Sequence, residues 1–185
     1  MRKLIVSEFV TLDGVMEAPG GEPSHPHSGW VFDHMSPEQE HYKLDEVMDA
    51  ESLLLGRVTY EGFSAAWPSV EGDFGDKMNS MPKHVASTTL RDPQWNATVL
   101  EGDVPSAVQA LKDGDGGSIL VAGSSTLVHT LLLESLVDEL RLMVFPVSIG
   151  HGLRVFPEER AKLPWKLVDQ RTFPTGVMAL TYRPA

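Results

Sequence analysis

Short apolar runs alternate along the chain with segments of helical periodicity. Residues 53–55 and 119–121 are continuous runs of Leu, Ile and Val, which suits strands that are buried on both faces of a sheet. An apolar stripe with three- and four-residue spacing follows the second run and consists of Leu127, Val128, Leu131 and Leu132. Strands followed at once by amphipathic helices predict an α/β protein with a mostly parallel sheet.

The rest of the pattern supplies further elements. It predicts strands at 3–10, 83–88, 99–100 and 140–145, and helices at 37–50, from 57 onward and at 105–112. Ser36, Pro37 and Gln39 mark the start of the first helix as a capping box with proline at the first position. Two final strands, 166–173 and 177–182, are predicted to form an antiparallel hairpin that closes the sheet.

The turn after the second apolar run has the composition of an anion site. Gly123, Ser124, Ser125 and Thr126 are small or hydroxylated, so a ligand can approach the backbone, and the first turn of the next helix presents unpaired amides. Phosphate is the ligand that suits such a helix start. The same arrangement also occurs in α/β proteins that bind nothing there, so this turn alone leaves both possibilities open.

A second turn repeats the pattern and adds a guanidinium. Gly56 follows the other apolar run, and Arg57 and Thr59 begin a helix, so two such turns on one sheet favour a pyrophosphate. Ser87 and Thr88 end a third strand and are candidates for a further phosphate, although Ser and Thr are also ordinary turn residues.

Acidic and aromatic residues supply candidates for the substrate side. Asp13 lies at the carboxyl end of the first strand, where it is either a substrate contact and candidate catalytic residue or the cap of its own turn. Trp30 and Asp33 are candidates for a pocket that binds a flat heterocycle, with core packing as the alternative for the aromatic ring. His25 and His27 lack a third ligand in pattern, so no metal site is expected.

Composition narrows the class of protein. A chain of 185 residues with 42% hydrophobic and 22% charged positions fits one soluble globular domain, spanning 1–185. The absence of cysteine excludes disulfides, and the first residues are too short an apolar run for a signal peptide, so we expect a cytoplasmic protein. A net charge of -11 argues against nucleic acid or an anionic membrane as partner.

Several segments in order resemble a known superfamily: TLDG, LLLGRVTYE, KHVASTTL, VAGSSTLVHTLLLESLVDEL and GVMALTYRP. The chain is similar to dihydrofolate reductase-like proteins, in particular to the reductase domain of the bifunctional riboflavin-biosynthesis deaminase-reductase. The resemblance implies a three-layer fold with a mostly parallel central sheet, helices on both faces and an antiparallel edge hairpin. It also implies NADPH as hydride donor and, together with the exposed edge of the last strands, a homodimer.

The resemblance assigns roles residue by residue. Gly56, Arg57 and Thr59 match the turn at the cofactor phosphates, and Ser87 and Thr88 match the strand end near the adenosine 2'-phosphate. The second phosphate turn corresponds to Gly123, Ser124, Ser125, Thr126 and Leu127, with Gly-Ser where the dihydrofolate reductases proper have two glycines.

The functional expectation is an NADPH-dependent reductase of a small heterocycle, either a ribosylaminopyrimidine of the riboflavin pathway or a pterin. An alternative from another class is a non-catalytic NADPH-binding or sensor protein that has lost its acid. The proton donor is left open, because Asp33, Asp45, Glu46 and Asp49 do not match the family spacing on the first helix.

Overall fold

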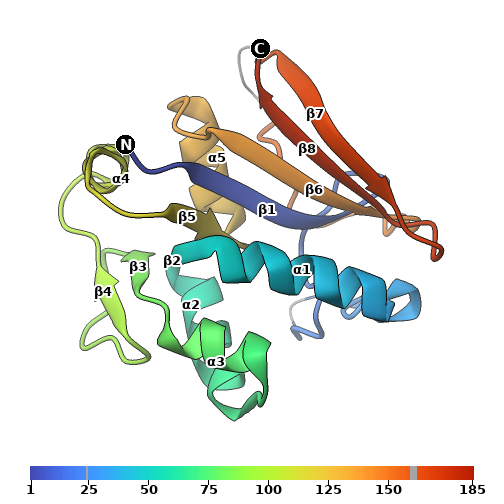
Figure 1. Ribbon diagram of the computed structural model, residues 1–185, viewed down its shortest axis with the longest axis horizontal. Helices are drawn as coiled ribbons and strands as arrows, with labels where there is room; N and C mark the ends of the chain where they lie inside the picture. Colours follow the sequence, from blue (N-terminus) through green and yellow to red (C-terminus); the bar gives the residue numbers. More distant parts are fainter. Residues whose placement is uncertain (24, 159–161) are drawn as a thin grey trace.

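In the computed structural model, which describes residues 1–23, 25–158 and 162–185, eight strands form one sheet. The strands are β1 (Leu4–Thr11), β2 (Ala50–Gly56), β3 (Lys83–Ala86), β4 (Ala97–Val99), β5 (Ser118–Val121), β6 (Glu139–Phe145), β7 (Trp165–Thr172) and β8 (Met178–Pro184). Their order is β4-β3-β2-β5-β1-β6-β8-β7 (Figure 1). All neighbours are parallel except that β8 runs antiparallel to β6 and β7.

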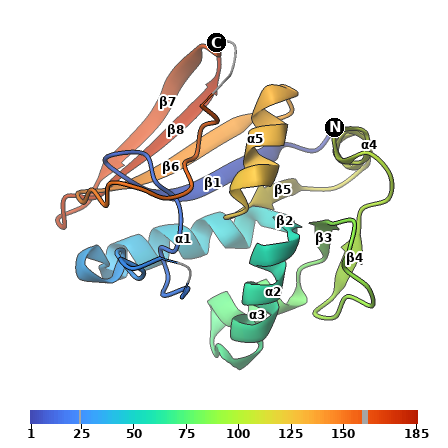
Figure 2. The ribbon, with the colours of Figure 1, turned by 180° about the vertical axis from the view of Figure 1, so that it is seen from behind.

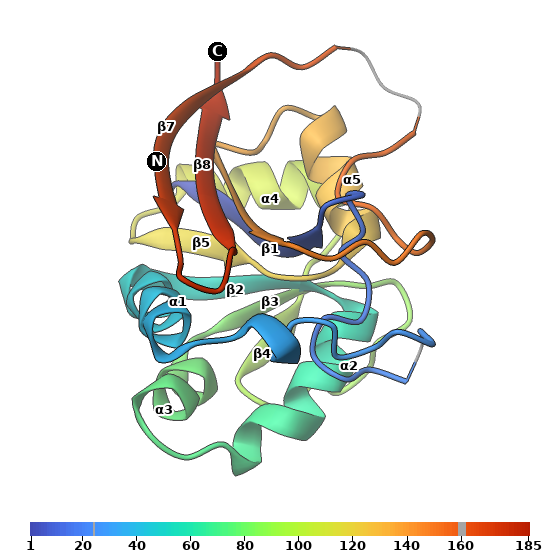
Figure 3. The same cartoon turned by 90° about the vertical axis from the view of Figure 1, so that its right-hand side faces the viewer.

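Helices cover both faces of the sheet. They are α1 (Pro37–Asp49), α2 (Arg57–Ala66), α3 (Asp73–Ser80), α4 (Val104–Asp113) and α5 (Ser125–Leu133), with short 3-10 turns η1 (Phe32–His34) and η2 (Trp67–Ser69). Leu54 and Val121 pack with α4 and α5 on one face, whereas Leu53 and Leu55 pack with α1 and α3 on the other. The side view separates α1 and α3 from α5 across the sheet (Figure 3).

The predicted fold class is confirmed. The α/β architecture, the mostly parallel sheet and the antiparallel carboxy-terminal hairpin are all present, and the predicted elements lie within a few residues of the observed ones. Sequence reasoning missed α3, which is only eight residues long, contains just two large apolar side chains, Phe74 and Met78, and has two aspartates in its first turn. It also overstated the cap of α1, because the Ser36 hydroxyl donates to Gln39 Oε1 at 2.8 Å and accepts no helix amide.

The strand β7 forms one edge of the sheet, and the side chains on both of its faces are exposed. The residues of β7 after Trp165 are exposed, and Leu167 and Val168 keep about two fifths of their surface in contact with solvent. The hairpin β7–β8 extends past the helical layers (Figure 1). No helix in the described part of the chain is long and apolar enough to cross a membrane.

Candidate functional site

The two predicted phosphate turns meet at the carboxyl ends of neighbouring strands. Leu54 of β2 pairs with Val121 of β5, so Gly56 and Gly123 leave the sheet at the same edge. The amide of Gly56 donates to Ser124 Oγ at 2.8 Å and joins the start of α2 to the start of α5. Both helices begin beside this edge (Figure 2). One hydrogen bond therefore joins two residues that are 68 positions apart in the sequence.

Close contact at this junction requires small residues. Gly123 has φ +68°, and a Cβ added there would lie 3.0 Å from Thr59 Cγ2. A Cβ on Gly56 would lie 3.2 Å from Ser124 Cβ. Ser124 also has a left-handed backbone, with φ 68°. The two glycines therefore let the Thr59 and Ser124 side chains pack directly against the backbone of the opposite turn.

Unpaired amides lie in the first turns of α2 and α5. Neither helix has a side-chain cap, and no carbonyl inside a helix can satisfy its first amides. The amides of the two turn glycines are already used, because that of Gly56 donates to Ser124 Oγ at 2.8 Å and that of Gly123 donates to Glu8 Oε2 at 2.9 Å. The donors that remain for an anion at the second turn are those of Ser125 and the residues after it, at the positive end of the α5 dipole.

Arg57 has a partner of its own. Its Nη1 donates to both carboxylate oxygens of Glu61, one helical turn later, at 2.8 and 2.9 Å. The guanidinium stays partly exposed, with 42% of the side-chain surface open. A phosphate at this turn would share Arg57 with Glu61 or displace it.

The third predicted position lies next to the junction. β3 is paired with β2, with Ala86 opposite Gly56, so Ser87 emerges one step along the same edge. The Ser87 Oγ accepts the amides of Thr89 and Leu90, which shapes the turn and leaves its hydroxyl proton free to donate. Thr88 is exposed, and its carbonyl accepts from Arg91 Nη1 at 3.2 Å. The structure thus brings Gly56, Arg57, Thr59, Ser87, Thr88 and the 123–127 turn to one edge of the sheet.

Asp13 lies at the end of β1 and ties two loops together. Its Oδ1 accepts the Thr11 hydroxyl at 2.6 Å and the Ile149 amide at 3.3 Å, and its Oδ2 accepts the Gly150 amide at 2.7 Å. The hydrogen bond from Thr11 lowers the pKa of Asp13 most, followed in the same direction by those from Gly150 and Ile149. The capping role and the substrate role are compatible, and the catalytic role of Asp13 stays a prediction.

Trp30 and Asp33 occupy different surroundings. Trp30 is buried, packs edge-on against Phe145 with 5.4 Å between ring centroids, and donates from Nε1 to the Glu17 carbonyl. This is the packing alternative named for it above. Asp33 is exposed in η1, beside the exposed Phe32. Contact of either residue with a substrate stays a prediction.

The side chain of His25 contacts the backbone of two other histidines, His27 and His151. His25 is buried, its Nδ1 accepts the His27 amide at 3.0 Å, and its Nε2 lies 3.0 Å from the His151 carbonyl. Among the described residues, no group of three or more His, Asp or Glu side chains is placed to hold a metal ion.

Sequence reasoning missed two acidic residues at the site, Glu8 and Glu61. Glu8 lies in a strand among apolar residues, is 4% exposed, and accepts the Gly123 amide of the predicted phosphate turn. Burial raises the pKa of its carboxyl well above the usual value, despite the opposing Gly123 hydrogen bond. An acidic residue at a position that alternation assigns to the core was the signal available for Glu8; four-residue spacing from Arg57 was the signal for Glu61.

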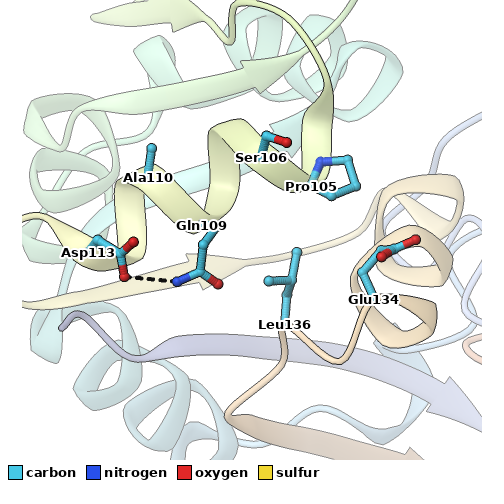
Figure 4. A pocket seen from close by; sticks show the side chains of 7 residues that line it. All are labelled: Pro105, Ser106, Gln109, Ala110, Asp113, Glu134 and Leu136. Atoms are coloured by element: carbon cyan, nitrogen blue, oxygen red, sulfur yellow. Dashed lines mark hydrogen bonds between the residues drawn. The ribbon is translucent and has the colours of Figure 1, made fainter.

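A separate groove of about 450 Å³ lies between α4 and the end of α5. It is lined by Pro105, Ser106, Gln109, Ala110, Asp113, Glu134 and Leu136 (Figure 4). The groove is wide open and runs along α4 to the residues just after α5, whereas the predicted phosphate turns lie at the starts of α2 and α5. It therefore contributes nothing to the candidate site.

Two proteins of Bacillus subtilis are similar to nearly the whole chain. The chain is 28% identical to the uncharacterized protein YyaP of Bacillus subtilis over 98% of its own length and 94% of that protein. It is 25% identical to YwjB of the same organism over 95% of both chains.

Solved structures share the fold. A putative riboflavin biosynthesis protein from Shewanella aligns with a TM-score of 0.75 at 19% identity, covering 99% of both chains. RibD of Acinetobacter baumannii aligns over the whole chain and 58% of its own, with a TM-score of 0.68 at 15% identity. A pyrimidine reductase-like protein of Corynebacterium diphtheriae gives 0.67 at 12% identity, over 100% and 92%. Residues 2–179 match the RibD C-terminal domain family, and the chain therefore belongs to that family.

Proposed function

We propose that the protein is an NADPH-dependent reductase that transfers a hydride to a small heterocyclic substrate. The observation that carries this proposal is the hydrogen bond from the Gly56 amide to Ser124 Oγ, which holds two uncapped helix starts against each other. Two adjacent amide-lined turns match the two phosphates of a dinucleotide. Membership of the RibD C-terminal domain family supports a reductase of the riboflavin-pathway type.

The residues at this edge suit NADPH in their chemistry. Gly56 and Gly123 allow the two turns to approach each other closely, so that both helix starts could face one pyrophosphate, and Arg57 adds positive charge beside them. Ser87, Thr88 and Arg91 would lie on the side of the adenosine 2'-phosphate. NADPH would supply the hydride, and the chain would bind, orient and shield the reacting groups.

For the substrate we propose a flat heterocycle, with a ribosylaminopyrimidine or a pterin as the compounds to test. The support is the family, together with a structural neighbour described as pyrimidine reductase-like. In this proposal Asp13 is the catalytic carboxylate that orients a substrate amine or hydroxyl, and Trp30 and Asp33 line the substrate side. The ionised Asp13 is suited to accepting such a hydrogen bond or to moving a proton through water.

A second candidate is a non-catalytic NADPH-binding protein. The observation in its favour is that all three hydrogen bonds described for Asp13 come from the protein itself, and that its lowered pKa keeps it ionised and unable to donate a proton at neutral pH. This candidate predicts the same cofactor affinity and no oxidation of bound NADPH.

The experiment is a calorimetric titration with NADPH and NADH, followed by single turnovers in which the nicotinamide absorbance is followed after mixing with pyrimidine and pterin substrates. We expect tighter binding of NADPH than of NADH and loss of absorbance with at least one substrate. Ser124→Ala should weaken binding because it removes the bridge to Gly56, whereas Ser64→Ala, on the exposed side of α2, serves as control. Absence of NADPH binding would overturn the proposal; binding without turnover of any substrate would favour the second candidate.

We also infer that two copies associate through the open β7 edge. An exposed edge strand with free backbone groups and apolar residues on its surface is commonly covered by a second chain in a closed pair.

A further inference from the structure

Glu8 lies directly beside the second phosphate turn. Val6 of β1 pairs with Val121 of β5, so Glu8, two residues further on, comes level with Gly123. Its Oε2 accepts the Gly123 amide at 2.9 Å, and its side chain is almost fully buried. A carboxyl group therefore supports the turn that we propose binds an anion.

The other carboxyl oxygen has no partner in the described part of the chain. Glu8 Oε1 is buried and receives no hydrogen bond. A buried carboxylate with one unpaired oxygen is far more costly than a neutral carboxylic acid. Burial accordingly raises the pKa of Glu8, and Gly123 opposes this only in part.

Charged groups around Glu8 do not change this balance. The charged groups on the neighbouring elements include Lys43 and Glu46 on α1, Arg141 on β6, His129 on α5 and Arg57 on α2. Lys43 lowers the pKa of Glu8 and Glu46 raises it, both as lesser effects than burial. Each of the five groups makes a hydrogen bond to a group other than Glu8.

We propose that Glu8 is a proton-linked positioning residue: as a neutral acid it holds the Gly123 turn open to a phosphate group, and as a carboxylate it excludes that group. The reason is electrostatic. The Glu8 carboxylate would lie within hydrogen-bonding distance of the turn that holds the phosphate, and two anions this close repel strongly in a buried setting. Anion binding and ionisation of Glu8 are thus mutually exclusive. The inference rests on the proposed function, since it concerns the same phosphate turn.

The test is a calorimetric titration of the full chain with NADPH between pH 6 and 9, in pairs of buffers that differ in ionisation enthalpy. Glu8→Gln keeps a carbonyl oxygen for the Gly123 amide but cannot ionise; Glu38→Gln, at an exposed position of α1, is the matched control. Above the Glu8 pKa, wild type and the control should lose about tenfold in affinity per pH unit and should take up one proton on binding. Glu8→Gln should show neither the loss of affinity nor the proton uptake. The only remaining pH dependence should come from the ligand phosphate, which contributes equally in all three proteins.

Infrared spectroscopy of the free proteins provides a measurement that does not depend on the ligand. Wild type at neutral pH should show the band of a protonated carboxyl that is missing in Glu8→Gln. Coinciding pH profiles of wild type and Glu8→Gln, or absence of that band, would overturn the inference. Failure of wild type to bind NADPH at any pH would instead overturn the proposed function and leave the infrared result to decide the state of Glu8.

Discussion

The guanidinium of Arg57 is held by Glu61 one helical turn later, with 2.8 Å between Nη1 and Oε2. The arginine expected to bind phosphate is thus shared with a carboxylate that repels phosphate. Glu61→Gln should free Arg57 and tighten NADPH binding by roughly 1.4- to fivefold, because an exposed ion pair contributes about 0.2–1 kcal/mol. Fluorescence or calorimetric titration measures the change. Weaker binding in Glu61→Gln would mean that Glu61 orients Arg57 for the cofactor and does not compete with it.

Gly123→Ala should damage the junction of the two turns. The new methyl group would lie 3.0 Å from Thr59 Cγ2 on a backbone with φ +68°. We expect a loss of about 1–3 kcal/mol in the free energy of unfolding, since a left-handed backbone costs most residues about 1–2 kcal/mol before the clash is added. Urea unfolding measures it.

Gly62→Ala is the matched control for that variant. Gly62 lies in α2 with open space around its Cα, so alanine should stabilise the helix by up to about 1 kcal/mol. Combining Gly123→Ala with Thr59→Ser removes the contacting methyl group and should restore part of the loss. A Gly123→Ala protein as stable as wild type would show that the turn tolerates a side chain.

Asp13→Asn should separate the two roles of this residue. If Asp13 acts on the substrate, turnover should fall strongly while NADPH affinity is unchanged. If it serves only as a cap, activity per folded molecule should be preserved. Kinetics at saturating NADPH and a melting curve make the comparison.

The pH dependence of stability gives an independent check on Asp13. Its folded pKa is lowered, so its contribution is present above the unfolded pKa of about 3.9 and is lost as the pH falls through the folded value. Wild type should therefore lose more stability than Asp13→Asn on acidification below about pH 4. Parallel acid unfolding curves would contradict the hydrogen-bonded role.

Lys83 predicts a pH dependence of stability with the same sign, at alkaline pH. Its ammonium is buried, donates to the Asn79 carbonyl at 3.0 Å, and lies 4.0 Å from the centroid of the Trp95 ring. Burial lowers the pKa of Lys83 to about 8. The Trp95 ring face opposes part of this effect because it favours the charged form.

The unfolded chain holds this proton up to about pH 10.4 and the folded chain releases it earlier, so stability should rise with pH through this interval. We expect a rise of about 1 kcal/mol, reduced from the full linkage value by the cation–π contact. Lys83→Met should remove it. Chemical unfolding of both proteins at pH 7.5, 9 and 10 measures the difference, and equal slopes for the two proteins would contradict the assignment.

The open β7 edge predicts a dimer. Light scattering at micromolar concentration should give twice the mass of one chain. Introducing charge with Leu167→Lys and Val168→Lys, both already exposed, should give a folded monomer, because like charges would face each other across the paired edge. A wild-type protein that scatters as a monomer would end this proposal.

The sequence predicts the frame of the protein well and the contacts within the site less well. Apolar runs such as Leu53 to Leu55 report burial on both faces, and this local signal suffices to place the strands. The turns could be placed as well, because each one begins where an apolar run ends. The pairing of β5 between β1 and β2 depends on long-range packing, and no local pattern specifies that Gly56 meets Ser124.

The side chains that were missed share a physical cause. Glu8 and Glu61 act through neighbours that are distant in the sequence or on the next helical turn. The Gly123 amide was expected to be free and is bonded to a residue 115 positions earlier. Residue type indicates the available chemistry, and the fold decides which atoms remain free to use it.

The bond between Gly56 and Ser124 also has a consequence for assembly of the protein. Its two partners are 68 residues apart, and β5 must insert between β1 and β2 before they can meet. A nascent chain that ends before β5 therefore carries one half of the proposed anion site and lacks the other half. The proposed site is completed late in synthesis, so a truncated product that keeps β1 to β4 should not compete with the finished protein for the proposed nucleotide.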